Sequence, residues 1–109
     1  MDEAATVYIL RCADGSYYTG LTKKPVDARL WEHNNRLVDG YTSSRTPVEL
    51  VFAEPFASIV DAIAVEQRIK RWSRAKKEAL IARDYERLKS LARSRQDRGN
   101  APRGSTGSP

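Results

Sequence analysis

The sequence predicts a small α/β domain of the α+β type, in which helices flank a three-stranded antiparallel sheet. Two observations lead to this fold class: short runs of β-branched and aromatic residues between turn signals, and longer stretches with apolar residues at helical spacing. The 109 residues fit one domain with a single small core, which we expect residues 1–92 to form. Residues 93–109 are rich in Arg, Ser, Gly and Pro, so we expect them to form a basic, disordered tail.

Three segments predict strands. Residues 6–12 and 16–21 are rich in β-branched and aromatic side chains, and the Asp-Gly pair between them is a strong hairpin signal. Residues 48–53 predict a third strand, which Pro55 is expected to close. Three strands with a helix packed on them are about the minimum for a stable sheet.

The loop between the first two strands decides whether two tyrosines share a face of the sheet. A two-residue turn would place Tyr8 and Tyr18 on opposite faces. A three-residue loop over residues 13–15, with Gly15 in the left-handed region, would place Tyr18 opposite Leu10. Both tyrosines would then lie on one face, and we expect this second arrangement.

Three helices are predicted. Pro25 suits a first helical turn, so residues 25–37 predict a helix with an apolar stripe of Val26, Leu30 and Leu37. Ser58 is a suitable N-cap for a second helix, which ends near Trp72 and is expected to bury Ile59, Ala62, Ile63, Val65 and Ile69. Ser73 then caps a third helix, whose residues at helical spacing are Ile81, Tyr85, Leu88 and Ala92.

The composition favours a polyanionic partner and a reducing compartment. Lys and Arg total 19 against 14 for Asp and Glu, and the resulting net charge of +5 is a modest excess. The single cysteine, Cys12, allows neither an intramolecular disulfide nor a Cys-based zinc site. No stretch has the roughly 20 apolar residues that span a bilayer, and none indicates a secretory signal. We therefore expect a cytoplasmic protein with no membrane partner and no small-molecule cofactor.

Glu66 is the most informative single residue, because on a helical wheel it falls inside the apolar arc of the second predicted helix. A charged carboxylate there is costly unless it is paired, coordinated or opened to solvent. Three explanations stay open: an ion pair to Lys70 or Arg29 or a partly wet edge position, a metal ligand, and a general base. A lone carboxylate could hold Mg²⁺ only if waters and a substrate phosphate completed the shell, which suits phosphate chemistry.

Four other side chains are candidates for chemistry, and each also has a structural explanation. Arg29 can offer a bidentate donor set to a phosphate, or it can pack its stem along a helix surface. His33, the only histidine, lies one helical turn further on and can be structural or catalytic. Tyr8 and Tyr18 can fill a half-buried strand face, or one of them can act as a base if a neighbouring cation lowers its pKa from about 10.

A basic run around one tryptophan follows Glu66. Such a run is either a solvated helical face or a nucleic-acid contact in which cations meet the backbone and the ring stacks on a base. The helix break at Ser73 would gather these charges around a corner, which favours the nucleic-acid contact. The candidate residues are Arg68, Lys70, Arg71, Trp72, Arg74, Lys76 and Lys77.

Four ordered motifs resemble those of GIY-YIG endonuclease domains, and the likeness is greatest to the small stand-alone bacterial members. The resemblance covers residues 5–82, and although each motif is weak by itself, four in this order are fairly specific. The motifs are Val7-Tyr8-Ile9, Tyr18-Thr19-Gly20, Ala28-Arg29-Leu30-Trp31-Glu32-His33-Asn34 and Glu66-Gln67-Arg68-Ile69-Lys70. Val7 replaces the glycine and Thr19 the isoleucine of the family's name, and neither position supplies a catalytic group.

The resemblance implies one-metal hydrolysis of nucleic-acid phosphodiester bonds, with DNA as the expected substrate and DNA repair as the expected setting. Tyr8 and Tyr18 would position or deprotonate the attacking water, and Arg29 would stabilise charge on the phosphoryl oxygens. Glu66 would hold Mg²⁺ or Mn²⁺, and His33 would assist at the phosphate or relay a proton. The alternative is a non-catalytic nucleic-acid-binding module with the same fold.

Overall fold

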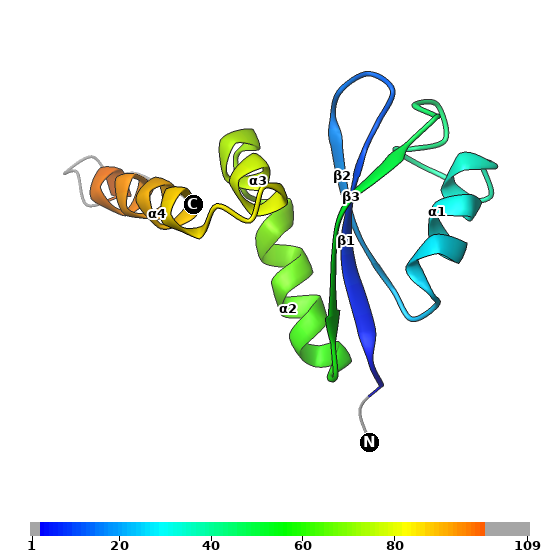
Figure 1. Ribbon diagram of the computed structural model, residues 1–109, viewed down its shortest axis with the longest axis horizontal. Coiled ribbons are helices and arrows are strands. Elements are labelled where there is room, and N and C mark those ends of the chain that lie inside the picture. The colour runs from blue at the N-terminus through cyan, green and yellow to red at the C-terminus, as the bar shows by residue number, and fades with distance from the viewer. Residues whose placement is uncertain (1–2, 100–109) are drawn as a thin grey trace. The chain divides into compact units, whose positions relative to one another are not determined.

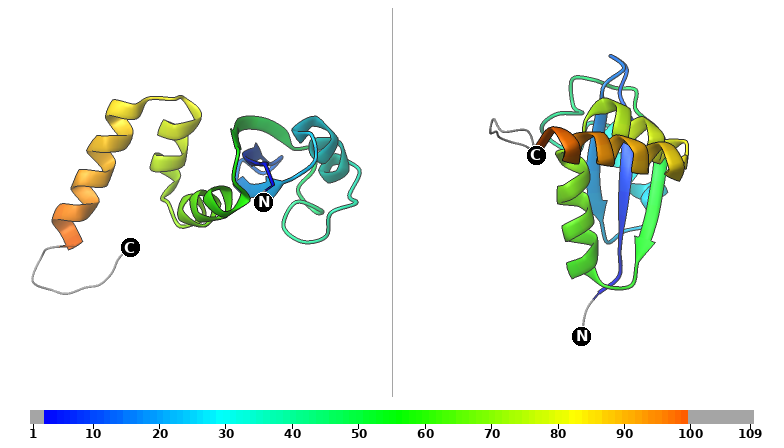
Figure 2. Two further views of the ribbon diagram at one scale, coloured as in Figure 1. Left: turned by 90° about the horizontal axis from the view of Figure 1, so that it is seen from below. Right: turned by 90° about the vertical axis from the view of Figure 1, so that its left-hand side faces the viewer.

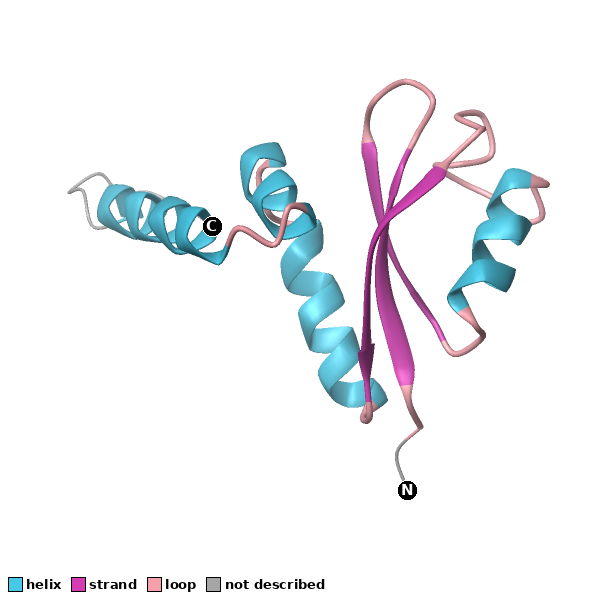
Figure 3. Ribbon diagram, viewed as in Figure 1, coloured by secondary structure: helices cyan, strands magenta, loops and turns pink. Residues whose placement is uncertain are grey.

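The computed structural model describes residues 3–99, with side chains as far as Arg93. These residues form three strands and four helices in two compact units, the first ending at Lys70 and the second beginning at Arg71 (Figures 1 and 3). In chain order the elements are β1 (Ala5–Arg11), β2 (Tyr17–Thr22), α1 (Val26–Asn34), β3 (Glu49–Phe56), α2 (Ile59–Lys70), α3 (Arg74–Ile81) and α4 (Tyr85–Gly99). The predicted α+β fold class is confirmed.

The β1–β2 hairpin has the predicted register. Leu10 pairs with Tyr18 and Tyr8 pairs with Gly20, so both tyrosine side chains lie on one face of the sheet. Residues 13–15 form the loop, with the Cys12 amide donating to the Ser16 carbonyl at 2.8 Å. Gly15 has φ +86°, the left-handed conformation that glycine adopts at little cost. The three-residue loop is therefore confirmed.

The sheet has the order β2-β1-β3, so β1 is the central strand and pairs antiparallel with both neighbours. The third strand is longer than predicted, because β3 runs to Phe56 and includes Pro55. Pro55 lies opposite Thr6 on an edge strand, where the missing amide hydrogen of a proline is tolerated. A bulge between Ile9 and Leu10 shifts the β1–β3 register and sharpens the local twist.

The two faces of the sheet are covered by different helices of the first unit, α1 on one side and α2 on the other (Figures 1 and 2). Side chains alternate along β1, so Val7 and Ile9 are buried on the side of α2. On the side of α1, a core cluster contains Tyr8, Leu10, Cys12 and Val48. The candidate tyrosines therefore belong to the core between the sheet and α1.

Two predicted apolar stripes are partly wrong. Helix α1 ends at Asn34 and not at residue 37, since Arg36 has φ +59° and cannot continue a right-handed helix. Leu37 is 65% exposed and is not part of the core. In α2 the buried positions are Ala62, Glu66 and Ile69, whereas Ile63 is 40% exposed.

The second unit begins as predicted but then departs from the prediction. The Ser73 side chain caps α3 by accepting a hydrogen bond from the Lys76 amide at 3.2 Å. The single helix predicted from Ser73 onward is wrong, because α3 ends at Ile81 and Arg83 takes φ +56° before α4 begins. Helix α4 continues to Gly99, so the backbone of residues 93–99 is helical, while residues 100–109 of the predicted tail lie outside the described residues. The boundary at residue 92 stays a prediction.

Candidate active site

Tyr8 lies at the centre of the site because the strand opposite it carries no side chain there. A Cβ atom added to Gly20 would lie 2.5 Å from both Cζ and Oη of Tyr8. Such a contact is far shorter than van der Waals distance, so only glycine lets the Tyr8 ring lie against β2. The tyrosine side chain is 1% exposed.

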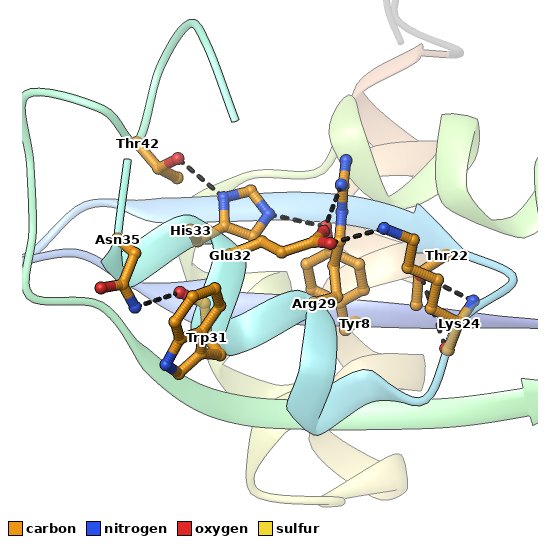
Figure 4. Close-up of polar contacts among 9 residues, drawn as sticks. All are labelled: Tyr8, Thr22, Lys24, Arg29, Trp31, Glu32, His33, Asn35 and Thr42. Carbon is orange, nitrogen blue, oxygen red and sulfur yellow. Dashed lines mark hydrogen bonds and ion pairs between the residues drawn. The ribbon is translucent and has the colours of Figure 1, made fainter. Parts of the chain in front are cut away.

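A buried hydrogen-bonded chain runs from Tyr8 through His33 to Thr42 (Figure 4). The Tyr8 Oη atom lies 2.8 Å from His33 Nε2, and His33 Nδ1 lies 2.7 Å from Thr42 Oγ1. Neither His33 nor Thr42 is more than 1% exposed. The three residues come from β1, α1 and the loop between α1 and β3, so only the folded chain brings them together.

Two sets of hydrogen bonds hold the loop that carries Thr42. At its end near β3, the Asn34 side chain accepts from the Val48 amide at 2.7 Å and donates to the Val48 carbonyl at 3.0 Å. Arg45 contacts the β1–β2 hairpin, since its Nε donates to Asp14 Oδ2 at 3.0 Å and its carbonyl accepts from a hairpin amide at 2.9 Å. These bonds fix the loop against the sheet and so fix the position of Thr42.

Tyr18 lies beside the buried chain without joining it by a hydrogen bond. Its ring centroid lies 6.4 Å from that of Tyr8 and 5.2 Å from that of His33. The Tyr18 ring also stacks on the ring of Tyr41, with 6.2 Å between the ring centroids and an interplanar angle of 21°. The Arg45 guanidinium lies 3.9 Å from the centre of the Tyr41 ring, a cation–π contact at the edge of the site.

Arg29 joins the buried chain to a small ionic cluster. Its guanidinium donates through Nη1 to Glu32 at 2.9 Å, and its charge acts on the Tyr8 phenol. Glu32 also pairs with Lys24, at 2.5 Å (Figure 4). The hydrogen bonds from Lys24 and Arg29 hold the pKa of Glu32 below its usual range, so this carboxylate stays charged and keeps Arg29 in place.

Burial sets the protonation states of the chain. It raises the pKa of Tyr8, an effect that the neighbouring Arg29 guanidinium opposes and the charges of Tyr18 and Glu66 reinforce. Burial likewise lowers the pKa of His33, and the Arg29 charge lowers it further. Tyr8 is therefore a neutral phenol and His33 a neutral imidazole near pH 7.

Glu66 lies in the buried stripe of α2, as its place on the helical wheel predicted. Its side chain is 11% exposed and its Oε2 atom lies 2.9 Å from Lys70 Nζ, so the ion pair considered from sequence is present. The carboxylate is also close enough to Tyr8 to influence the pKa of the phenol. Tyr8 and His33 are thus in contact, and Arg29 and Glu66 lie within electrostatic reach of the Tyr8 phenol.

The side chains present fit a cation held by one carboxylate. Within residues 3–99, no three His, Cys, Asp or Glu side chains gather where they could enclose a metal ion. Glu66 alone suits Mg²⁺ or Mn²⁺, which keep several waters and take further oxygen ligands from a phosphate. Lys70 is half-exposed at the chain's surface, and a cation at Glu66 would have to displace its ammonium group.

Three of the candidate nucleic-acid-binding residues lie where α2 ends, and one of the three is engaged in an ion pair. The Arg68 side chain lies on the outer face of α2, and Arg71 follows the helix. Lys70 is the partner of Glu66. Arg68 and Arg71 therefore offer the more accessible charges.

The candidate basic residues of the second unit are less free. The Arg74 guanidinium pairs with Glu78 at 3.0 Å. Lys76 is buried, with its Nζ atom 4.6 Å from the centre of the Trp72 ring. Lys77 is half-buried, and burial lowers its pKa. Trp72 and Lys76 thus have a structural role as a cation–π pair, whatever they contact besides.

Sequence reasoning missed the residues that support the site. Thr42, Glu32, Lys24 and Arg45 carry no periodic signal, since three of them lie in or next to loops. Glu32 was quoted as part of a motif, and its i,i+3 spacing from Arg29 was an available hint. Thr42 could not have been found, because its partner His33 is nine residues away across a loop of irregular backbone.

The fold and the order of the motifs define a domain of the GIY-YIG class, a family with nuclease-type function, and comparison with known proteins agrees. The chain belongs to the GIY-YIG family, since residues 4–79 match the GIY-YIG catalytic domain. The family resemblance drawn from the four motifs is therefore confirmed.

Among its relatives are small proteins of several organisms. A UPF0213 protein of Streptococcus pneumoniae is 40% identical over 87 residues, which cover 80% of this chain and 87% of that protein. A UPF0213 protein of Halobacterium salinarum is 50% identical over 75 residues, or 69% and 96% of the two chains. The solution NMR structure of protein EF2693 from E. faecalis has a TM-score of 0.52 at 30% identity, and the match covers 78% and 92% of the chains.

Proposed function

We propose that this protein is a divalent-metal-dependent endonuclease that hydrolyses phosphodiester bonds, with DNA as its substrate. The observation that carries the proposal is the Tyr8 phenol, which is buried, hydrogen-bonded to His33, and within electrostatic reach of both Arg29 and Glu66. A tyrosine that only fills a strand face needs none of these three partners. The grouping of a proton acceptor, a phosphate-binding cation and a carboxylate around one hydroxyl suits phosphodiester hydrolysis.

In this reaction a water oxygen forms a bond to phosphorus and the bond to the leaving oxygen breaks. The water proton passes to Tyr8 Oη while the phenol's own proton passes to His33 Nε2, which lies 2.8 Å away. This double transfer avoids a free phenolate, which burial makes costly. Among the residues with described side chains, none accepts a hydrogen bond from Tyr18 in this way, so Tyr8 is the better candidate for the base.

Arg29 and Glu66 serve the negative charge of the substrate. Arg29 donates to the phosphoryl oxygens, where charge grows in the transition state. Glu66 holds the Mg²⁺ or Mn²⁺ ion, which supplies further positive charge beside the phosphate when it is bound. Arg68 and Arg71 are exposed and would contact the nucleic-acid backbone.

One observation favours a second function, a nucleic-acid-binding module without catalysis. Lys70 occupies Glu66 Oε2 at 2.9 Å, so the carboxylate already has a partner. In a binding module this ion pair would persist, and the basic residues alone would bind the nucleic acid. The two functions differ in whether Mg²⁺ displaces Lys70.

The deciding experiment measures cleavage of labelled single-stranded, duplex and branched DNA, with an RNA of the same sequence, in Mg²⁺, Mn²⁺ or chelator. We compare the wild type with Arg29→Ala and Glu66→Gln, and with the exposed controls Arg87→Ala and Glu86→Gln from α4. The proposal expects metal-dependent cleavage that both site variants lose and both controls keep.

Other outcomes have defined meanings. Cleavage that survives in Glu66→Gln would come from a contaminating nuclease and would remove the support for catalysis. Binding without cleavage of any substrate would establish the binding module instead. Cleavage of RNA alone would correct the substrate, and a role in DNA repair would then be wrong.

A further inference from the structure

Thr42 is the one member of this hydrogen-bonded chain that has no role in the proposed reaction. Its hydroxyl lies 2.7 Å from His33 Nδ1, and its side chain is 1% exposed. An oxygen so far from solvent can serve the imidazole without contacting a substrate. The remaining question is which atom of each hydrogen bond, from Tyr8 to His33 and from His33 to Thr42, carries the hydrogen.

The hydroxyl of Tyr8 indicates the direction of these hydrogen bonds. The phenol keeps one proton, and at 1% exposure that proton needs an acceptor inside the protein. His33 Nε2 is in place at 2.8 Å. If Nε2 carried a hydrogen instead, the phenol proton would be buried with no partner on this line of contacts.

We propose that Thr42 is a positioning residue, which accepts a hydrogen bond from His33 Nδ1–H and thereby leaves Nε2 as the acceptor for the Tyr8 proton. The opposite tautomer is excluded only when Nδ1 donates to Thr42 and Nε2 accepts from Tyr8 at the same time. The catalytic consequence rests on the proposed nuclease function, whereas the tautomer is a property of the folded protein alone.

The surroundings of His33 support a fixed ring. The Tyr18 ring packs beside it at 5.2 Å and the Tyr8 ring at 5.8 Å, so the imidazole is held on two sides. The charged groups that act on it are Arg29 and Glu32, which are paired with each other. Thr42 lies on the far side, from the loop that Arg45 ties to the hairpin.

Nitrogen-15 NMR of the imidazole tests the proposal directly. His33 is the only histidine in the sequence, so one long-range proton–nitrogen spectrum at pH 7.5 contains a single set of ring signals. The wild type is expected to show a protonated Nδ1 and an unprotonated Nε2. A protonated Nε2 in the wild type would overturn the proposal without any variant.

Two substitutions separate the hydroxyl from the volume of Thr42. Thr42→Val keeps the shape and removes the hydroxyl, so its spectrum should move toward a mixture of tautomers, while Thr42→Ser should match the wild type. An unchanged spectrum in Thr42→Val would show that the hydroxyl does not set the tautomer. If Thr42→Val fails to fold by circular dichroism, Thr42→Ser must still keep the wild-type tautomer, and a changed one would refute the proposal.

Cleavage kinetics then test the consequence. Thr42→Val should lower kcat by about 10- to 100-fold with KM unchanged, as expected when the partner that orients an imidazole is removed. Thr42→Ser should recover most of that loss. A wild type with the expected tautomer that cuts nothing would refute the nuclease and leave the tautomer standing, whereas full activity in Thr42→Val would refute the positioning role alone.

Discussion

Replacing Gly20 by alanine should destabilise the protein far more than a methyl group on a strand ordinarily does. The added Cβ would lie 2.5 Å from Tyr8 Cζ and Oη, and ordinary contact begins at 3.4 Å, so the ring must retreat by 0.9 Å. The Tyr8 ring is buried against His33, and a shift of that size is enough to break the 2.8 Å hydrogen bond. The perturbation therefore combines overpacking with a lost buried bond.

The magnitude follows from those two effects. Overpacking costs about 1–3 kcal/mol and an unsatisfied buried polar group about 1–3 kcal/mol, while the stiffer unfolded chain returns about 0.5–1 kcal/mol. The net expectation is a loss of about 2–4 kcal/mol in the free energy of unfolding. In a domain of this size each kcal/mol lowers Tm by about 4–8 °C.

Urea denaturation followed by circular dichroism measures this loss, and a double-mutant cycle with Tyr8→Leu assigns it. Removing the ring should relieve the clash, so Gly20→Ala should cost less stability in the Tyr8→Leu background. The difference should be about 1 kcal/mol or more, which is typical of the coupling between residues in contact. Gly40→Ala is the control, since that position has φ +106° and open space around it, and its cost should not depend on Tyr8. Additive costs in the Gly20 cycle, or a Gly20→Ala protein as stable as the wild type, would refute the reasoning.

Three further predictions test the loop, the histidine and the basic surface. Asn34→Ala leaves a buried backbone amide and carbonyl without partners and should cost about 2 kcal/mol or more in urea denaturation, against about 0.5 kcal/mol for the exposed neighbour Asn35→Ala. Because burial lowers the pKa of His33 below 6.5, the unfolded state takes up a proton first, so stability should fall as the pH drops below about 6.5. His33→Gln should lose that slope, and an unchanged slope would assign it to another group. Arg68→Ala should lower the salt dependence of DNA binding, measured as the slope of log K against log salt, by about 0.9 if it contacts one phosphate, and Arg87→Ala should leave the slope unchanged.

Much of the fold could be predicted because its signals are local. The Asp-Gly turn and the glycine at residue 15 fix the hairpin register, and the register alone places Tyr8 and Tyr18 on one face. Ser73 was recognisable as a cap from its own side chain. Element ends were less well predicted, since Pro55 stays within β3 only because that strand lies at an edge.

The errors in the helices share one cause. Helical spacing predicts which residues lie on one stripe of a helix, but the tertiary contacts decide which of those residues are buried. Leu37 and Ile63 fit their stripes and are exposed, because α1 ends early and α2 presents Ala62 and Ile69 to the sheet instead. The positive φ of Arg83 interrupts the last predicted helix, and no residue preference in the sequence predicts this turn.

By itself, the sequence determined the family, the fold class and the residues that bear chemical groups, since motif order and local periodicity are properties of the chain. Only the tertiary structure decided how those groups act on one another. Tyr8 gains its hydrogen-bond partner in His33, and His33 gains a second partner in Thr42, across distances in sequence that no periodicity spans. Burial then sets the pKa values of the phenol and the imidazole, because the cost of a charge depends on the surroundings that the whole fold creates.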